Sequence, residues 1–277
     1  MRRYSHLRSR AEVNPLSNLD LAASTASGEF DPAWRSALRS AAFEAFSTGA
    51  MPDQSEEIWR YVDLDFDLNE YTVSTSDTTN LGDDPLLEHL IDPIAVRVVG
   101  DAYVGSDHVD DGFSVMSLRR AATDHPDAVR NVVERAGVSA RDGLFAAAAG
   151  AFGGDGVFIH AGPSVVAPSA VAIDLRAGAD GSVSFPAVVI SAGEHADVSV
   201  VVHLRSHADA DTIVVPQLSA LVGAGARVSL SLVQNLGYSA RSLGYLRCEV
   251  GADAGFQFAE IGLGGRLARL HLDVGLE

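Results

Sequence analysis

The sequence predicts a parallel β-helix preceded by a smaller mixed α/β module. A helix with clear start and stop signals lies near the N-terminus, while the second half reads as short strands without a helix. Glycine also recurs in that second half at a nearly constant spacing. These three observations indicate one chain with two regions of different secondary-structure pattern, and the boundary lies near residue 150.

Residues 31–49 predict the first helix. Asp31 can cap its free N–H groups, Pro32 suits its first turn, and Gly49 can adopt the left-handed conformation that ends a helix. The predicted apolar face has spacings of four, three and four residues, and consists of Trp34, Leu38, Ala41 and Ala45. A polar linker follows this helix and the stretch PDQSEEIWRYVDL, in which Trp59 and Tyr61 share a side if the backbone is extended.

The middle of the chain predicts mixed structure. Residues 93–104 and 112–122 resemble short strands, and residues 126–137 have helical spacing. Asp142 can cap a short alanine-rich helix that a group of glycines then ends. These glycines are Gly150, Gly153 and Gly154.

From Val157 onward, short apolar-alternating strands follow one another, and three of them share a motif. SAGEHADVSVVV, LVGAGARVSLSLV and EVGADAGFQFAEI place Gly193, Gly223 and Gly251 at intervals of 30 and 28 residues. Such self-similarity is typical of stacked solenoid coils, whose corners must stay small to stack closely. A β-sandwich would also contain strands with alternating apolar residues, but it typically has turns every ~8–12 residues and no sequence repeat of longer period. The pattern therefore favours the parallel β-helix.

Three regions follow from these patterns. Residues 1–75 are predicted to form a helical N-terminal module with its linker, and residues 76–150 a mixed α/β segment that leads into the core. Residues 151–277 are predicted to form the parallel β-helix, incomplete at its C-terminal end.

Composition excludes several function classes. Twenty basic against 37 acidic residues give a net charge of −17, which repels nucleic acid and anionic lipid. All basic residues are arginine, so no lysine exists for a P-loop ATPase site. The single cysteine, Cys248, excludes an internal disulfide and a cysteine-rich metal cage. The first residues, MRRYSHLRSRAEV, lack the apolar core of a secretory signal peptide and are expected to be an ordinary N-terminus. The expected location is therefore the cytoplasm.

The polar residues that could carry chemistry are each expected to have a structural role. Cys248 lies two residues from an apolar neighbour on either side, so it shares their face of the strand and is expected to be a buried thiol. Asp63, Asp65 and Asp67 lack the glycine and glutamate of a Ca²⁺ loop and are expected to belong to the polar linker. The histidines are expected to be solvated strand or turn residues rather than metal ligands; they are His160, His195, His203, His207 and His271.

Two alternative functions remain open on this evidence. A carbohydrate-active β-helix enzyme would need carboxylates gathered in one groove, but acidic residues are abundant throughout this chain and give no selective signal. The candidate carboxylates are Asp174, Glu194, Asp197, Glu249 and Glu260. The other alternative is a purely structural solenoid.

An N-terminal motif and four later blocks, in order, carry a family resemblance. P-x-x-x-E-E-x-W-R-Y-x-D-L after a capped helix, DGLFAAAAGAFGGDGVFIHAGPSVVAPSAVAIDL, FPAVVISAGEHADVSVV and LVGAGARVSLSLVQNLG resemble the SufB/SufD family of the SUF iron–sulfur cluster assembly system. GLGGRLARLHLDVGLE continues the match, which covers residue 30 to the end. The compact module with W-R-Y-x-D-L favours the SufD branch.

The resemblance implies a right-handed parallel β-helix without enzymatic activity. It implies a scaffold subunit that pairs with SufB and docks the ATPase SufC, which hydrolyses ATP, while the iron–sulfur cluster forms on the SufB–SufD complex. No cofactor is expected on this chain alone, and no catalytic, cofactor-binding or metal residue is transferred to it.

The sequence departs from the family pattern at its end. It stops at LHLDVGLE within a strand-like alternation, whereas the family continues through further β-helix and a helical segment. That part carries the SufB-pairing surface, the SufC-docking helices and a cluster-facing histidine. The expectation is therefore that this sequence is a fragment of a longer reading frame.

Overall fold

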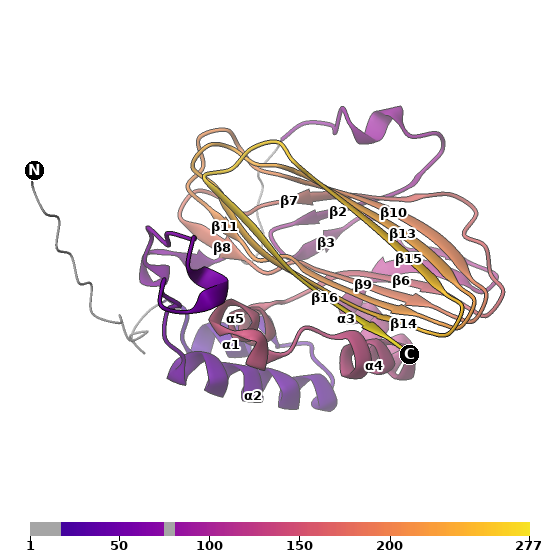
Figure 1. Cartoon of the computed structure of the whole chain (residues 1–277), viewed down its shortest axis with the longest axis horizontal. Coiled ribbons are helices and arrows are strands. Elements are labelled where there is room, and N and C mark those ends of the chain that lie inside the picture. The colour runs from indigo at the N-terminus through magenta and orange to yellow at the C-terminus, as the bar shows by residue number, and fades with distance from the viewer. Residues whose placement is uncertain (1–17, 75–80) are drawn as a thin grey trace, which may run out of the picture.

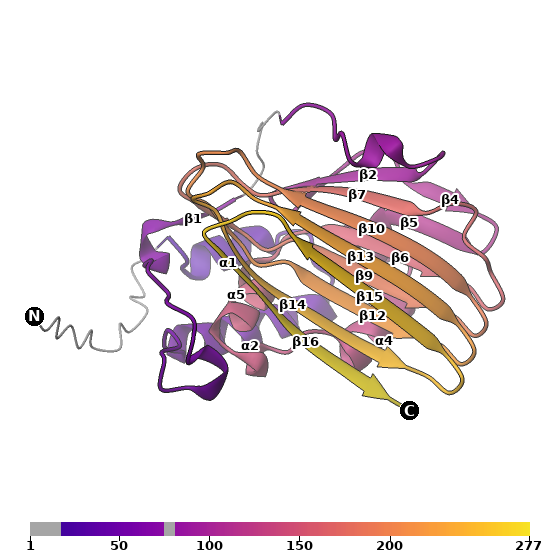
Figure 2. The same ribbon diagram turned by 45° about the horizontal axis from the view of Figure 1, so that its top comes forward.

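The computed structural model describes residues 18–74 and 81–277, and in it a β-solenoid of about four turns follows a mixed α/β region. The N-terminal start and part of the predicted polar linker lie outside the described residues. Figures 1 and 2 show the solenoid strands stacked side by side, with the helices gathered against one of its faces. The helices are α1 (Leu21–Ser27), α2 (Ala33–Thr48), α3 (Leu118–Asp124), α4 (Pro126–Ala136) and α5 (Leu144–Phe152), with short 3₁₀ turns η1 (Glu57–Trp59), η2 (Leu68–Glu70), η3 (Leu87–His89) and η4 (Ala140–Asp142).

Two sheets form the walls of the solenoid. The first runs in the order β1-β8-β11-β14-β12-β9-β6-β5-β4 with β16 beside β14, and the second in the order β15-β13-β10-β7-β2-β3. The strands before the predicted solenoid are β1 (Thr72–Val73), β2 (Ile94–Val99), β3 (Ala102–Val104), β4 (His108–Asp110) and β5 (Phe113–Ser117). The later strands are β6 (Gly156–Ala161), β7 (Val171–Arg176), β8 (Ser182–Ser184), β9 (Ala187–Ala192), β10 (Asp197–Arg205), β11 (Ile213–Val214), β12 (Gln217–Val222), β13 (Arg227–Asn235), β14 (Arg241–Val250), β15 (Gly255–Gly262) and β16 (Leu267–Leu276).

The glycine repeat marks one corner of the solenoid, as the sequence predicts. A Cβ on Gly223 would lie 2.8 Å from the backbone of Gly193 and Glu194, and one on Gly251 would lie 3.0 Å from the backbone of Ala224. Successive corners therefore approach too closely for a side chain. Parallel pairing of Asp197 with Arg227, and of Arg227 with Gly255, keeps the repeat in register.

The interior of the solenoid is filled by columns of aliphatic side chains. Ile173, Val202 and Leu232 are fully or almost fully buried and occupy the same register position on three successive strands. Alternation with period two puts every second residue of each strand inside. Because these columns fill the interior, the second half of the sequence buries its apolar side chains without needing a helix.

Within the described ranges, the α-helices cover the outer face of one of the two sheets. Phe145 and Phe152 of α5 pack with Val183 and Leu243 of that sheet in one apolar cluster. A second cluster joins α3 and α4 to Phe158, Val189 and Leu221. The opposite sheet is crossed by residues 81–93, called the strap below, which Figure 1 shows above β2 and β7.

The first predicted helix is confirmed, but its predicted face and its caps are wrong. The buried residues of α2 are Arg39, Ala42 and Phe46, while Leu38 is 49% exposed. Arg39 is buried because its guanidinium donates to the Ala151 and Gly153 carbonyls and to Asp31. Asp31 therefore makes an ion pair instead of a cap. Gly49 is extended rather than left-handed.

Two other local predictions need correction. The predicted strand at 112–122 ends at Ser117, since the Ser117 hydroxyl accepts from the Arg120 N–H and starts α3. Asp142 does not cap α5; it pairs with Ser139 in the capping box of η4, and Gly143 precedes α5. The helix predicted at 126–137 is confirmed as α4.

Candidate functional site

A network of buried charges lies on the outer wall of β7 and β10, beneath the strap. Asp174 is 5% exposed and accepts hydrogen bonds from Nε of Arg97 (3.0 Å), Arg176 (2.9 Å) and Arg205 (2.7 Å). The residues meet because β2, β7 and β10 are adjacent parallel strands and their outward side chains line up. Although burial opposes ionisation, the hydrogen bonds and charges of Arg205 and Arg176 lower the pKa of Asp174 to about 2.

The strap supplies the remaining partners of this network. The Gly82 carbonyl accepts from Nη2 of both Arg176 (2.7 Å) and Arg205 (3.0 Å), and the Asp83 carbonyl accepts from Nη1 of Arg205 (3.2 Å). The Asp84 carboxylate lies 2.8 Å from Nδ1 of His203. The strap therefore follows the wall mainly through polar contacts.

His203 corrects the expectation of a solvated histidine. It is 3% exposed and pairs with a carboxylate that lies 119 residues away in the sequence. An ionised carboxylate only accepts, so Nδ1 carries the proton of this hydrogen bond. His207, by contrast, is exposed as expected.

A pocket of about 370 Å³ opens beside this pair, and we call it the strap pocket. His203 and Arg205 contribute to its inner wall, and Asn235 and Tyr238 lie towards its outside. Its apolar lining includes Leu81, Pro85, Leu236 and Leu263.

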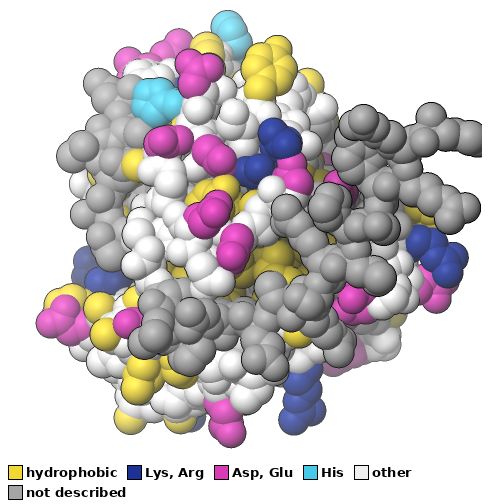
Figure 3. Space-filling view, turned by 90° about the vertical axis from the view of Figure 1, so that its left-hand side faces the viewer, with side chains coloured by type: hydrophobic (Ala, Val, Ile, Leu, Met, Phe, Trp, Pro, Cys, Tyr) yellow, Lys and Arg dark blue, Asp and Glu magenta, His cyan; other side chains and the backbone are white. Residues whose placement is uncertain are grey.

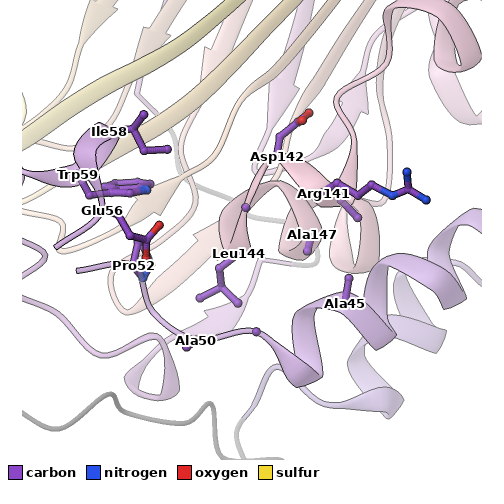
Figure 4. Close-up of a pocket in the computed structure, with 13 residues that line it drawn as sticks. Ala45, Ala50, Pro52, Glu56, Ile58, Trp59, Arg141, Asp142, Leu144 and Ala147 are labelled. Carbon is purple, nitrogen blue, oxygen red and sulfur yellow. The ribbon is translucent and has the colours of Figure 1, made fainter. Parts of the chain in front are cut away.

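A second pocket of about 380 Å³ involves the W-R-Y stretch, and we call it the motif pocket. Figure 4 shows Pro52, Glu56 and Trp59 on one side of it and Leu144 and Ala147 on the other. Its lining is mainly apolar. The carboxylate of Asp142, which also lines it, is held by the Ser139 N–H.

Trp59 and Tyr61 do not share a side, contrary to the prediction. Trp59 lies in the 3₁₀ turn η1, is buried against Phe145 at 5.7 Å between ring centroids, and has the Arg269 guanidinium 4.0 Å from its ring. Tyr61 is 91% exposed. Residues two apart share a side in an extended strand, but not in a turn with about three residues per turn. Of the two aromatic residues, Trp59 is therefore the one that packs the module against its neighbours.

The other candidate residues have structural surroundings. Cys248 is buried as predicted, and burial raises the pKa of its thiol to about 12, so it is not a thiolate at neutral pH. Asp65 is not merely part of a polar linker, because it pairs with Arg241 and Arg266. Within residues 18–74 and 81–277 no group of three or more His, Cys, Asp or Glu side chains could hold a metal ion.

The carboxylates of the carbohydrate-enzyme alternative are not assembled into one site. Asp174 faces outward and is held by arginines, whereas Glu260 follows the inward register of Leu232 on the last coil. Glu249 lies on β14 in the other sheet, next to Arg247. Acidic side chains are also spread over the face shown in Figure 3, so they mark no particular groove.

The buried carboxylate of Asp101, in the β2–β3 turn, leads us to predict an unusual pH dependence of the free energy of unfolding. It is 5% exposed, accepts from the Gly154 N–H at 2.7 Å, and burial raises its pKa to about 6. Because the folded pKa lies above the unfolded value, this group contributes less stability as pH rises from about 4 to about 6. Asp101→Asn keeps an oxygen for Gly154, so we expect it to raise stability at pH 7.5 by about 2 kcal/mol and to flatten this slope.

Urea unfolding followed by circular dichroism between pH 4 and pH 8 measures this effect. The matched control is Asp111→Asn, because Asp111 is exposed. An Asp101→Asn protein with the same slope as the unsubstituted chain would contradict the assignment.

No helix within the described ranges, 18–74 and 81–277, is long and apolar enough to cross a membrane.

Comparison with known proteins gives two adjoining family matches. Residues 31–173, more than half of the chain, match the model described as the SufBD protein N-terminal region. Residues 175–277 match the model described as SUF system FeS cluster assembly, SufBD core domain. The search of curated proteins found no match.

Proposed function

Because the chain belongs to the SufBD family of the SUF iron–sulfur cluster assembly system, we propose that it is a SufD-type scaffold subunit. Members of this family are generally non-catalytic scaffolds. In this proposal the chain pairs with SufB, the SufC ATPase drives the assembly, and the nascent cluster is the cargo of the complex. The compact helical module with Trp59, Arg60 and Tyr61 supports SufD over SufB. The proposed location is the cytoplasm.

The burial of Cys248 is the observation on which this proposal rests. The only thiol of the chain is fully buried and its pKa is raised to about 12, so it offers no thiolate to iron. Among the described residues no three His, Cys, Asp or Glu side chains are grouped so that they could hold a metal ion, and this also supports a cargo site that needs residues from a partner. The chain acts as a subunit, not as a complete cluster-binding protein.

The absence of lysine from the sequence also supports a role as one subunit of a complex, in which a partner hydrolyses ATP. A P-loop ATPase needs a lysine that reaches the β- and γ-phosphates of ATP, and this chain has none in 277 residues. ATP hydrolysis is therefore assigned to SufC.

Anaerobic co-expression of this chain with SufB and SufC from the same genome tests the proposal. We expect the tagged chain to co-elute with SufB on size exclusion, and iron and acid-labile sulfide to appear only when SufB is present. ATP hydrolysis should require SufC. Cys248→Ala is the matched variant and should leave the iron and sulfide content unchanged.

Two results would overturn the proposal. One is a chain that elutes alone in the presence of SufB and SufC. The other is loss of bound iron and sulfide in the Cys248→Ala complex while that complex still assembles, because this would make the buried thiol a ligand.

A further inference from the structure

The motif pocket combines an apolar interior with a few polar groups. Ala45, Ala50, Pro52, Leu144 and Ala147 supply apolar surface around its volume of about 380 Å³. These residues come from α2, from the segment that follows it and from α5. A concave apolar space with a few fixed polar groups is the usual form of a small-molecule site. The polar groups therefore decide which ligand the pocket can hold.

One of these polar groups is a buried donor without an acceptor. Trp59 is 5% exposed, and the Phe145 ring and the Arg269 guanidinium hold its side chain in place. Figure 4 shows the end of the ring that carries the nitrogen pointing towards the middle of the pocket. Within residues 18–74 and 81–277, no side chain or carbonyl accepts a hydrogen bond from this nitrogen, Nε1. Because a buried indole N–H usually has a partner, this donor points to a ligand with an acceptor group.

A free acceptor lies beside this donor. The backbone N–H of Trp59 donates to the Glu56 carbonyl at 2.9 Å, and side chains three residues apart lie above one another in such a turn. Figure 4 accordingly shows Glu56 and Trp59 on the same side of the pocket. The Glu56 carboxylate is exposed and accepts from no donor in the described part of the chain, including the indole of Trp59. The pocket thus offers one donor and one acceptor next to an apolar surface.

This pair of groups selects the class of ligand. An anion that accepts from Trp59 would lie beside the like charge of Glu56, and Figure 4 shows the guanidinium of Arg141, which also lines the pocket, directed away from both. A cation would leave the indole N–H unpaired, and a hydrocarbon would leave both groups unpaired. An extended peptide residue, in contrast, presents its own N–H and C=O on the same side, as does a primary carboxamide.

We propose that the motif pocket binds an amide that carries an apolar group, either one extended apolar residue of a peptide or a small carboxamide. The carbonyl oxygen accepts from Nε1 of Trp59, the amide N–H donates to the Glu56 carboxylate, and the apolar group lies against Leu144 and Ala147. No group has to change its protonation state for this contact. The proposal is independent of the SufD assignment, since it concerns a ligand of the isolated chain.

Titration of the ¹⁵N-labelled full chain with N-acetyl-L-leucinamide, followed by the indole N–H signals in NMR spectra, tests the proposal. We expect a saturable shift of the Trp59 signal with a Kd on the order of 1 mM. The Trp34 signal should not move, because Nε1 of Trp34 is enclosed and Trp34 is not part of the pocket lining. N-acetylglycinamide should bind roughly tenfold more weakly, because it lacks the apolar group. Absence of a saturable Trp59 shift up to about 50 mM N-acetyl-L-leucinamide, where even a weak site would be detected, would overturn the proposal.

Two alanine substitutions locate the contact. Glu56→Ala removes the acceptor and should weaken N-acetyl-L-leucinamide binding roughly tenfold, while the backbone carbonyl that holds the turn remains. Glu57→Ala removes the same charge from the next residue, which is also exposed but does not line the pocket, and should leave binding unchanged. Equal affinity of the two variants would contradict the proposed contact.

Trp59→Phe tests the donor, with isothermal titration as the readout because the indole signal is lost. We expect loss of N-acetyl-L-leucinamide binding with a cooperative unfolding transition retained. If this variant does not fold, the pair of alanine variants still decides the question. A folded Trp59→Phe protein that binds as the unsubstituted chain does would refute the role of the indole N–H.

A longer probe distinguishes the two sources of the amide. Tighter binding of acetyl-alanyl-leucyl-alanine amide than of N-acetyl-L-leucinamide would support the proposal with a peptide as the source. Equal or weaker binding of the longer probe, with N-acetyl-L-leucinamide still bound, would support it with a small carboxamide as the source.

Discussion

Asp174→Asn is expected to destabilise the protein by about 3–5 kcal/mol, because it leaves the buried Arg176 and Arg205 and the partly exposed Arg97 facing a neutral amide. The carboxylate accepts from Arg97, Arg176 and Arg205 on three adjacent strands. The other carboxylate of the network, Asp84, pairs with His203 at 2.8 Å and lies 3.6 Å from Nε of Arg205. The substitution therefore removes the one carboxylate that accepts from all three of these guanidinium groups.

Urea unfolding at pH 7.5 measures this loss, and its pH dependence gives a second readout. The pKa of Asp174 is lowered to about 2, below its unfolded value, so its contribution is present above about pH 4 and is lost as pH falls towards 2. The Asn variant should lack this acid-sensitive component. Asp209→Asn, at an exposed position near the same end of the solenoid, should change stability by less than about 0.5 kcal/mol. Similar losses in both variants would show that the network is not the cause.

Phe152→Ala is expected to cost about 3–5 kcal/mol and to loosen α2 from the solenoid. The Phe152 ring is fully buried and meets Phe46 of α2 edge-on at 5.1 Å and Phe185, which follows β8, at 6.0 Å. It is thus one of the contacts through which the helical module packs on the sheet. Truncation leaves a cavity in the close-packed apolar cluster between the helices and the sheet, and relaxation of the neighbours closes it only in part.

Thermal unfolding and amide hydrogen exchange together test this second prediction. We expect a lower melting temperature and faster exchange in α2, with slow exchange retained in β10 and β13. Phe30→Ala is the matched control, since Phe30 is 61% exposed and should lose less than about 1 kcal/mol. Unchanged protection of α2 in the Phe152→Ala protein would contradict the proposed role of this ring.

Much of the architecture could be predicted from local sequence. The glycines at 193, 223 and 251 and the alternation after each of them predicted stacked coils, and their corners do lie in backbone contact. The helix at Pro126–Ala136 was also predictable from its spacing. The face of α2 was not, because the Asp31 carboxylate and two carbonyls that lie 112 and 114 residues away in the sequence decide that Arg39 is buried.

The strap pocket had no local signal. His203 alternates with apolar neighbours like other strand residues, and Asp84 lies in a polar stretch that resembles a linker. Neither residue type nor spacing indicates that they meet. Only the passage of the strap over β10 brings the carboxylate to the ring.

The sequence by itself determined the solenoid, its corner glycines, the buried thiol and the family. These features follow from periodicity, side-chain size and motif order, which act over a few residues or repeat along the chain. The tertiary structure alone decided which polar groups are buried together, such as Asp84 with His203 and Arg39 with the carbonyls of Ala151 and Gly153. The physical reason is that a charge is tolerated in the interior only when distant segments deliver its partners, and no local pattern records that meeting.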